Sequence, residues 1–162
     1  MEIPHFIYID YFTMSNKADR RVFMSNKVIR QHDTRDCGAA CLCMVARYFD
    51  KSYSIQFLRK LSHTSQDGVT IWGIVEAAEK IGLKGEAYSG DVNDLKEYMS
   101  QNSAPVMLHL KVNHFVVAYK KNTKFIYIKD PARGSYKIPW EHLDQIWSGY
   151  LIGFSKPQMM IV

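Results

Sequence analysis

The spacing of apolar residues changes halfway along the chain, from a helical period to short runs between turns. In the first half it predicts helices over residues 38–49, 55–61, 71–81 and 92–99, with one strand over 83–88. In the second half it predicts short strands over residues 105–110, 114–119, 124–129, 135–138 and 149–154, with one helix over 140–147. Helices first and antiparallel strands second are typical of an α+β domain.

Short polar residues precede the predicted helices and are suited to cap them. Asp36, Ser54, Thr70 and Asp91 each stand just before a helical pattern, where a side-chain oxygen can accept a free backbone N–H. Gly82 follows the helix over residues 71–81 and is suited to end it.

Length and composition set limits on the class of protein. The 162 residues, of which 47% are hydrophobic and 23% charged, suit one soluble globular domain with a single core. The formal net charge of +5 comes from scattered Lys and Arg without a long basic run, which argues against nucleic acid as a partner. An acidic or membrane-proximal partner is equally compatible with this charge. No segment reaches the ~20 consecutive apolar residues that a helix needs to span a bilayer. The sequence also contains no glycine-rich phosphate-binding loop, so we expect no nucleotide cofactor.

The organised region does not extend over the whole chain. We expect residues 1–28 to be an N-terminal extension with loose order, residues 29–155 to form the domain, and residues 156–162 to be a C-terminal tail. Residues 3–12 are aromatic, but Asp10 interrupts them and no basic stretch precedes them, so they make a poor secretory signal.

The three cysteines all fall within one predicted helix. Cys37 and Cys41 are helical neighbours, which rarely have the geometry of an unstrained disulfide, and the number of cysteines is odd. A reducing compartment is therefore the simplest interpretation. A zinc site is the alternative, but Cys43 lies off the face that Cys37 and Cys41 share, so we expect no metal.

Cys37 is the candidate nucleophile. It would lie in the first turn of the helix that follows Asp36, where free N–H groups and the helix dipole favour a thiolate. Gly38 could let a substrate backbone come close, and Gln31 could donate an amide N–H to an oxyanion near the sulfur. The alternative is an inert cysteine in a core helix; the polar residues that precede Cys37 favour the active site.

A cysteine nucleophile needs a base, and the base needs an orienting group. Of six histidines, His114 has the best position, because it begins an apolar strand beside a turn, whereas His109 suits a half-buried structural role. Asp130 ends the next predicted strand. If the two strands form a hairpin, His114 and Asp130 lie side by side at one edge of the sheet. The alternative for Asp130 and Pro131 is a plain turn.

Three blocks of sequence resemble a known family. QHDTRDCGAAC (residues 31–41), HFVVAY (114–119) and DPARG (130–134) resemble the N-terminal peptidase domain of bacterial peptide-exporting ABC transporters, which process double-glycine leaders of bacteriocins and other peptides. The resemblance covers residues 28–154 and keeps the order Gln, Cys, His, Asp. The membrane and ATP-binding domains that normally follow are not in the sequence, which agrees with an excised domain or with a free-standing one.

The resemblance implies a papain-like cysteine peptidase without a cofactor. Cys37 would be the nucleophile, His114 the general base and acid, Asp130 the orienting group, and Gln31 the oxyanion donor. It also implies a precursor peptide with a Gly-Gly leader as substrate, and the membrane and ATP-binding domains of an ABC transporter as partners. The expected location is the cytoplasmic face of the bacterial inner membrane.

A preference for two glycines implies a substrate cleft too narrow for a Cβ. The aromatic side chains of Trp72, Tyr119 or Trp140 could form such a cleft. The rest of the leader is expected to bind as an amphipathic helix in an apolar groove on the surface. Two other functions remain as alternatives. One is a module that binds leader peptides without cutting them, and the other is a papain-like acyltransferase or deamidase.

Overall fold

The computed structural model describes residues 27–157. The elements are η2 (Thr34–Asp36), α2 (Cys37–Tyr48), α3 (Ile55–Leu61), α4 (Ile71–Lys80), β1 (Lys84–Ser89), α5 (Val92–Gln101), β2 (Val106–Leu110), β3 (His114–Lys121), β4 (Phe125–Asp130), β5 (Gly134–Pro139), α6 (Trp140–Ile146) and β6 (Trp147–Ser155). Most of the proposed extension and tail, residues 1–26 and 158–162, lies outside the described residues, so their loose order stays a prediction.

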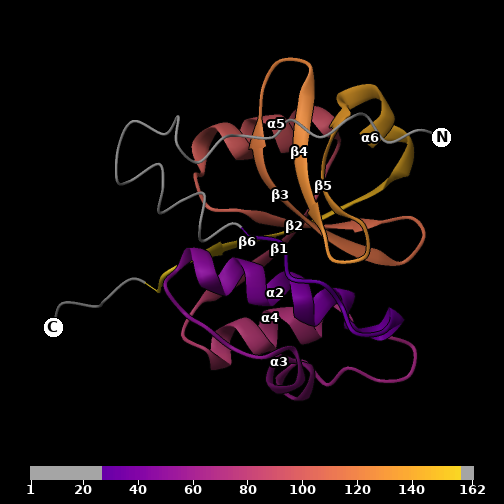
Figure 1. The fold of residues 1–162 in the computed structure, drawn as a ribbon. Coiled ribbons are helices and arrows are strands. Elements are labelled where there is room, and N and C mark those ends of the chain that lie inside the picture. The colour runs from indigo at the N-terminus through magenta and orange to yellow at the C-terminus, as the bar shows by residue number, and fades with distance from the viewer. Residues whose placement is uncertain (1–26, 158–162) are drawn as a thin grey trace, which may run out of the picture.

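The predicted α+β architecture is confirmed. Every helix and strand expected from the sequence is present, with ends that differ by at most two residues. The strands form one antiparallel sheet of order β1-β6-β2-β3-β4-β5. The strand that follows the first helices, β1, therefore lies at the edge of the sheet, beside the last strand of the chain (Figure 1).

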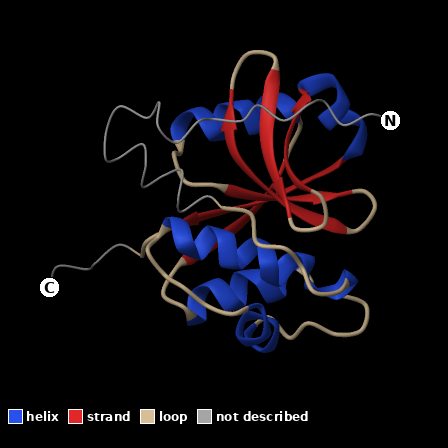
Figure 2. Ribbon diagram, viewed as in Figure 1, coloured by secondary structure: helices blue, strands red, loops and turns tan. Residues whose placement is uncertain are grey.

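Helices cover both faces of the sheet (Figure 2). Successive residues of a strand point to opposite faces, and in β2 Met107 packs against the core beneath α2, α3 and α4, whereas Val106 and Leu108 pack against α5 and α6. The α2 helix is buried along nearly its whole length because small residues, such as Ala39 and Ala40, allow close approach to the sheet.

Three of the four predicted helix caps are confirmed. Ser54, Thr70 and Asp91 accept the backbone N–H three residues on, at the starts of α3, α4 and α5. The cap expected at Asp36 is wrong. Because η2 runs directly into α2, the backbone of Asp36 is already helical, and its carboxylate accepts hydrogen bonds from Arg59 and from the N–H of Asp33 instead.

Candidate active site

The β3–β4 hairpin brings His114 and Asp130 together. These strands are antiparallel neighbours, so the first residue of β3 and the last residue of β4 meet at the same end of the sheet. Nε2 of His114 donates a hydrogen bond to Oδ1 of Asp130 at 2.8 Å. The proximity predicted from the hairpin is confirmed.

Asp130 is held by donors on both of its oxygens. Oδ1 also accepts the N–H of Ala132 at 2.8 Å, and Oδ2 accepts the hydroxyl of Tyr136 at 2.9 Å. Burial acts to raise the pKa of Asp130, but the hydrogen bonds from His114, Ala132 and Tyr136 outweigh it and lower that pKa below its ordinary value. The buried carboxylate therefore stays ionised and fixed in orientation.

The imidazole of His114 connects Asp130 with Cys37. Its side chain is 19% exposed, and besides the bond to Asp130 it lies near the Cys37 thiol, which affects its pKa. Because Nε2 is bonded to Asp130, Nδ1 is the ring nitrogen that is available to exchange a proton with Cys37. Burial alone would lower the pKa of His114, but the hydrogen bonds and charges of Asp130 and Cys37 raise it to about 9. His114 is thus held in its protonated form at neutral pH.

Cys37 is the first residue of α2, as the sequence predicted for a residue of the first helical turn. The residue before it, Asp36, has a fully buried side chain whose Oδ1 accepts the Nε–H of Arg59 at 2.8 Å, with Nη2 of the same guanidinium on that oxygen. Oδ2 of Asp36 accepts the N–H of Asp33 at 3.1 Å. Since Arg59 belongs to α3, this ion pair ties the start of the cysteine helix to the neighbouring helix.

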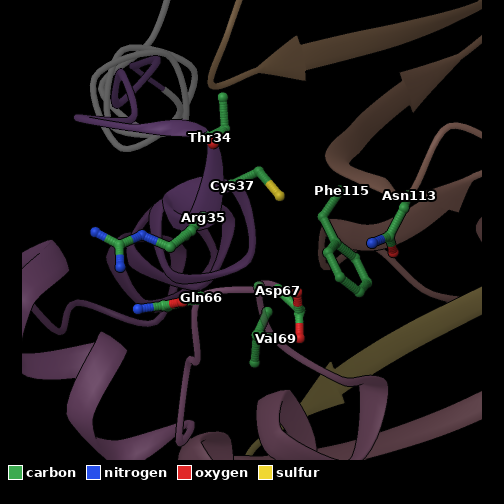
Figure 3. Close-up of a pocket in the computed structure, with 9 residues that line it drawn as sticks. Thr34, Arg35, Cys37, Gln66, Asp67, Val69, Asn113 and Phe115 are labelled. Atoms are coloured by element: carbon green, nitrogen blue, oxygen red, sulfur yellow. The ribbon is translucent and has the colours of Figure 1, made fainter.

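A cleft of about 110 Å³ opens at the thiol of Cys37. Figure 3 shows the sulfur pointing toward Phe115, with Asp67 and Val69 below it. The lining residues come from the start of α2, the loop before α4 and the start of β3: Thr34, Arg35, Cys37, Gln66, Asp67, Gly68, Val69, Asn113 and Phe115. A larger hollow of about 400 Å³ continues beyond Phe115, along Thr70, Ile71 and His109.

The walls of this cleft are not the aromatic residues expected from the sequence. Trp72 is 68% exposed, Trp140 is buried in the core under α5 and α6, and Tyr119 contacts Lys129 and Tyr127. None of the three lines the cleft. A loop of mixed polarity carries the wall residue Val69, and no periodic pattern marks it in the sequence.

Gly38 also has a different task from the one expected. It is buried against the cleft wall: a Cβ at this position would lie 2.2 Å from Cγ1 of Val69 and 3.1 Å from Cδ1 of Ile74. The missing side chain therefore allows the Val69 loop to pack against α2, and it does not serve a direct approach of substrate.

His109 holds Asn113, a wall residue of the cleft that the sequence did not single out. Nε2 of His109 lies 3.1 Å from Oδ1 of Asn113, and Nδ1 lies 3.0 Å from Oγ of Ser148. Asn113 has a positive φ of 55°, which asparagine tolerates well in a turn. The structural role expected for His109 is consistent with these bonds.

Gln31 lies beside the turn that follows Asp130. Its backbone N–H donates to the carbonyl of Pro131 at 3.0 Å, and Nη2 of the preceding Arg30 donates to Ala132 O at 2.7 Å. The side-chain amide of Gln31 forms no hydrogen bond within residues 27–157, and its Oε1 is buried without a partner. A buried polar atom without a partner is uncommon in folded proteins.

The other two thiols are enclosed. Cys41 is fully buried, its Sγ donates to the carbonyl of Phe115 at 3.3 Å, and burial raises its pKa well above the ordinary value. Burial also raises the pKa of Cys43 to about 12. Within residues 27–157, no group of three or more His, Cys, Asp or Glu side chains is arranged to hold a metal ion. These contacts give Cys41 a packing role in the core.

The fold is that of a papain-like cysteine peptidase domain. The chain belongs to the Peptidase C39 family, whose model matches residues 25–159.

Named relatives and solved structures agree with this assignment. The lactococcin-G-processing and transport ATP-binding protein LagD of Lactococcus lactis subsp. lactis is 34% identical over 136 residues, which are 82% of this chain and 19% of that protein. The peptidase domain of Streptococcus ComA, a bifunctional ABC transporter involved in quorum sensing, superposes with a TM-score of 0.75 at 34% identity, covering 82% of this chain and 99% of that one.

A double-glycine-motif protease from an AMS/PCAT transporter, solved in complex with the leader peptide, superposes with a TM-score of 0.74. It is also 34% identical, and the match covers 80% of this chain and 91% of that one. The chain spans about a fifth of the length of the curated relatives it matches. Among the helices of residues 27–157, none is both long and apolar enough to cross a membrane.

Proposed function

We propose that this domain cleaves leader peptides after a Gly-Gly pair, with Cys37 as nucleophile, His114 as general base and acid, Asp130 as orienting group and Gln31 as oxyanion donor. The observation that carries the proposal is the hydrogen bond between Asp130 and His114, with the imidazole near the Cys37 thiol at the cleft. Binding a leader without cutting it requires none of these three groups.

Attack begins from a thiolate–imidazolium pair. His114 takes the thiol proton on Nδ1, while its Nε2–H stays on Asp130, which fixes the ring and stabilises its charge. The sulfur then adds to the carbonyl carbon of the second glycine, and the negative charge moves to the carbonyl oxygen. The free amide of Gln31 and the backbone N–H of Cys37 are suited to bind this oxyanion.

The leaving amine and the water need the same imidazole. His114 gives the proton from Nδ1 to the amine as the C–N bond breaks, which leaves a thioester on Cys37. Neutral His114 then takes a proton from water, whose oxygen adds to the thioester carbonyl and expels the thiolate. The proton returned to Nδ1 restores the starting pair.

The shape of the cleft wall supports a preference for glycine in the substrate. Val69 and Phe115 flank the sulfur on the substrate side, and the loop approaches this closely because Gly38 has no side chain. A substrate residue with a Cβ would have to displace the partly buried Val69 or the buried Phe115. The 34%-identical protease solved with its leader peptide supports the same class of substrate.

The relatives support a proposal for the partners and the location. LagD combines processing with transport and ATP binding, and this chain matches about a fifth of its length. We infer that the present domain acts with the membrane and ATP-binding domains of a peptide exporter, at the cytoplasmic face of the bacterial inner membrane.

The test is cleavage of a synthetic precursor peptide with a Gly-Gly leader, read by mass spectrometry. The expected result is a single cut after the second glycine that disappears with Cys37→Ala, and a peptide with Ala at the second glycine should be cut far more slowly. Gln31→Ala should lower kcat by ~10²–10³.

Each of the other outcomes would contradict one part of the proposed function. A peptide that binds without being cut would favour the binding module, and transfer of the acyl group to an added amine in preference to water would favour an acyltransferase. An unchanged kcat with Gln31→Ala would remove the oxyanion role.

A further inference from the structure

The positive charge of the chain is concentrated in three strands. Residues 114–139, from the start of β3 to the end of β5, contain six Lys and Arg residues and one acidic residue, Asp130. Their formal charge of +5 equals the formal net charge of the whole chain, so the other residues sum to zero. Asp130 is buried and bonded to His114, at the active-site end of the strands.

The lysines of these strands lie on aromatic rings of the same sheet. Nζ of Lys129 lies 4.4 Å from the ring centroid of Tyr119, Nζ of Lys120 lies 5.2 Å from that of Tyr127, and Nζ of Lys137 lies 4.2 Å from that of Phe125. In the sheet register Tyr127 is opposite both Lys120 and Lys137. The contacts thus form one continuous surface of rings and ammonium groups.

We call this the lysine–aromatic surface. It consists of Tyr119, Lys120, Phe125, Tyr127, Lys129 and Lys137. At the tip of the hairpin it is continued by Lys124 and by Lys121, whose strand partner Ile126 belongs to the other face of the sheet. The turn between β3 and β4 contains Lys124 and directly follows Lys121, the last residue of β3. This turn projects beyond the rest of the sheet at the top of Figure 1.

Acidic groups of the described residues do not neutralise this surface. None of its lysines forms an ion pair with a residue of the 27–157 range. Val117 marks the face of the sheet that packs against α2. This helix contains Arg47 and no Asp or Glu. The acidic residues of α5 and α6 belong to helices that pack on the other face of the sheet, the face to which Lys121 belongs among these lysines.

We propose that the lysine–aromatic surface binds the anionic head groups of a membrane. Lysines near an anionic bilayer are attracted individually, and tyrosine and phenylalanine rings beside them suit the boundary between head groups and acyl chains. A projecting hairpin can reach such a boundary without burying the rest of the domain.

The proposal is independent of the peptidase function. His114 and Asp130 stand at one end of the hairpin and the lysines of the turn at the other, about seven residues away along β3, or roughly 20 Å at the rise of a strand. A membrane bound at the turn leaves the cleft at Cys37 open to a peptide. Cleavage of a soluble peptide therefore reports on the site, and vesicle binding reports on the surface.

The experiment uses the 162-residue chain and sedimentation with vesicles. One set contains phosphatidylglycerol and phosphatidylcholine, and the other contains phosphatidylcholine alone. The test variant combines Lys120→Ala, Lys121→Ala and Lys124→Ala. The tip lysines are preferred to Lys129, which lies deeper and whose pKa burial lowers to about 8. The control variant removes three exposed lysines elsewhere, by Lys60→Ala, Lys84→Ala and Lys156→Ala.

We expect binding to the anionic vesicles alone, lost at high salt, and weakened about 100-fold in the test variant but much less in the control. Both variants should cut a soluble precursor at the rate of the unmodified chain, which shows that they fold. Equal weakening in both variants would overturn the proposal, because bulk charge would then explain the binding. Absence of vesicle binding would overturn it too, including the case in which the surface binds a DNA duplex or poly-glutamate.

Discussion

Tyr136 donates its hydroxyl to Oδ2 of Asp130 at 2.9 Å, while His114 donates to Oδ1 of the same carboxylate. The two donors come from β5 and β3, the strands on either side of β4. The orienting group of the proposed triad is therefore itself oriented, by a residue that touches neither the thiol nor the cleft.

We expect Tyr136→Phe to lower the free energy of unfolding by about 1.5–3 kcal/mol at neutral pH, the cost of losing a hydrogen bond to a charged group. The Tyr136 hydroxyl helps to lower the pKa of Asp130, so the difference between variant and unmodified chain should shrink at acid pH, where Asp130 is protonated. Denaturant unfolding at several pH values measures this, and kcat should fall roughly tenfold as the ring of His114 loosens.

Tyr119→Phe is the matched control, since the Tyr119 hydroxyl makes no hydrogen bond within residues 27–157 and its ring lies on the lysine–aromatic surface. A loss of stability in Tyr136→Phe that is independent of pH would point to packing alone.

The activity should fall on the alkaline side as His114 loses its proton. The pKa of His114 is raised from 6.5 to about 9, so kcat/KM is expected to decline above about pH 9, where no imidazolium remains to protonate the leaving amine. A pH–rate profile with the soluble precursor measures it. A decline already near pH 6.5 would show that Asp130 and Cys37 do not hold the proton on His114.

The His114–Asp130 pair should make the free energy of unfolding depend on pH at both the acid and the alkaline end. Because the pKa of His114 is raised in the folded chain, its contribution is fully present below pH 6.5 and is lost as the pH rises through about 9. Because the pKa of Asp130 is lowered, its contribution is present above pH 3.8 and is lost as the pH falls through the folded value. In Asp130→Asn, unfolding monitored by circular dichroism should show a weaker dependence at both ends.

Gly38→Ala should damage the cleft through Val69. The added Cβ would lie 2.2 Å from Cγ1 of Val69, so the loop must move, at a cost of about 1–3 kcal/mol in unfolding free energy and with a higher KM for the precursor. Combining it with Val69→Ala removes the clashing methyl group and should recover part of the stability. If the double variant is as unstable as the sum of the single ones, the contact is not the cause.

One thiol of three should react in the folded chain. Cys41 and Cys43 are enclosed in the core, with pKa values raised by burial, whereas the sulfur of Cys37 faces the cleft. Iodoacetamide at neutral pH is expected to add one carbamidomethyl group, at Cys37, and three after denaturation. Peptide mapping by mass spectrometry locates the group. Rapid modification of Cys41 in the native chain would contradict the packing described here.

The elements and the hairpin were accessible from the sequence because they depend on local patterns. The periods of the apolar residues and the caps at Ser54, Thr70 and Asp91 act over a few neighbours, so they indicate helices and strands directly. The meeting of His114 and Asp130 needs one further assumption, that consecutive strands pair, which holds here.

The cleft was not accessible because its walls depend on contacts between distant segments. Val69 lies near the sulfur only because its loop packs on Gly38. Asp36 binds Arg59, which is distant in sequence, and does not cap the helix as expected. Tyr136 could have been found by counting register: the partner of Asp130 is Gly134, so Tyr136 pairs with Ile128, on the face that Asp130 shares.

The order of the active-site residues along the chain has a consequence for biosynthesis. Cys37 belongs to the first long helix, whereas His114 and Asp130 arrive with the third and fourth strands of the sheet. A ribosome therefore completes the thiol long before the imidazole and carboxylate that would activate it. Until the β3–β4 hairpin closes against α2, the nascent polypeptide contains the thiol of the proposed triad without its imidazole and carboxylate.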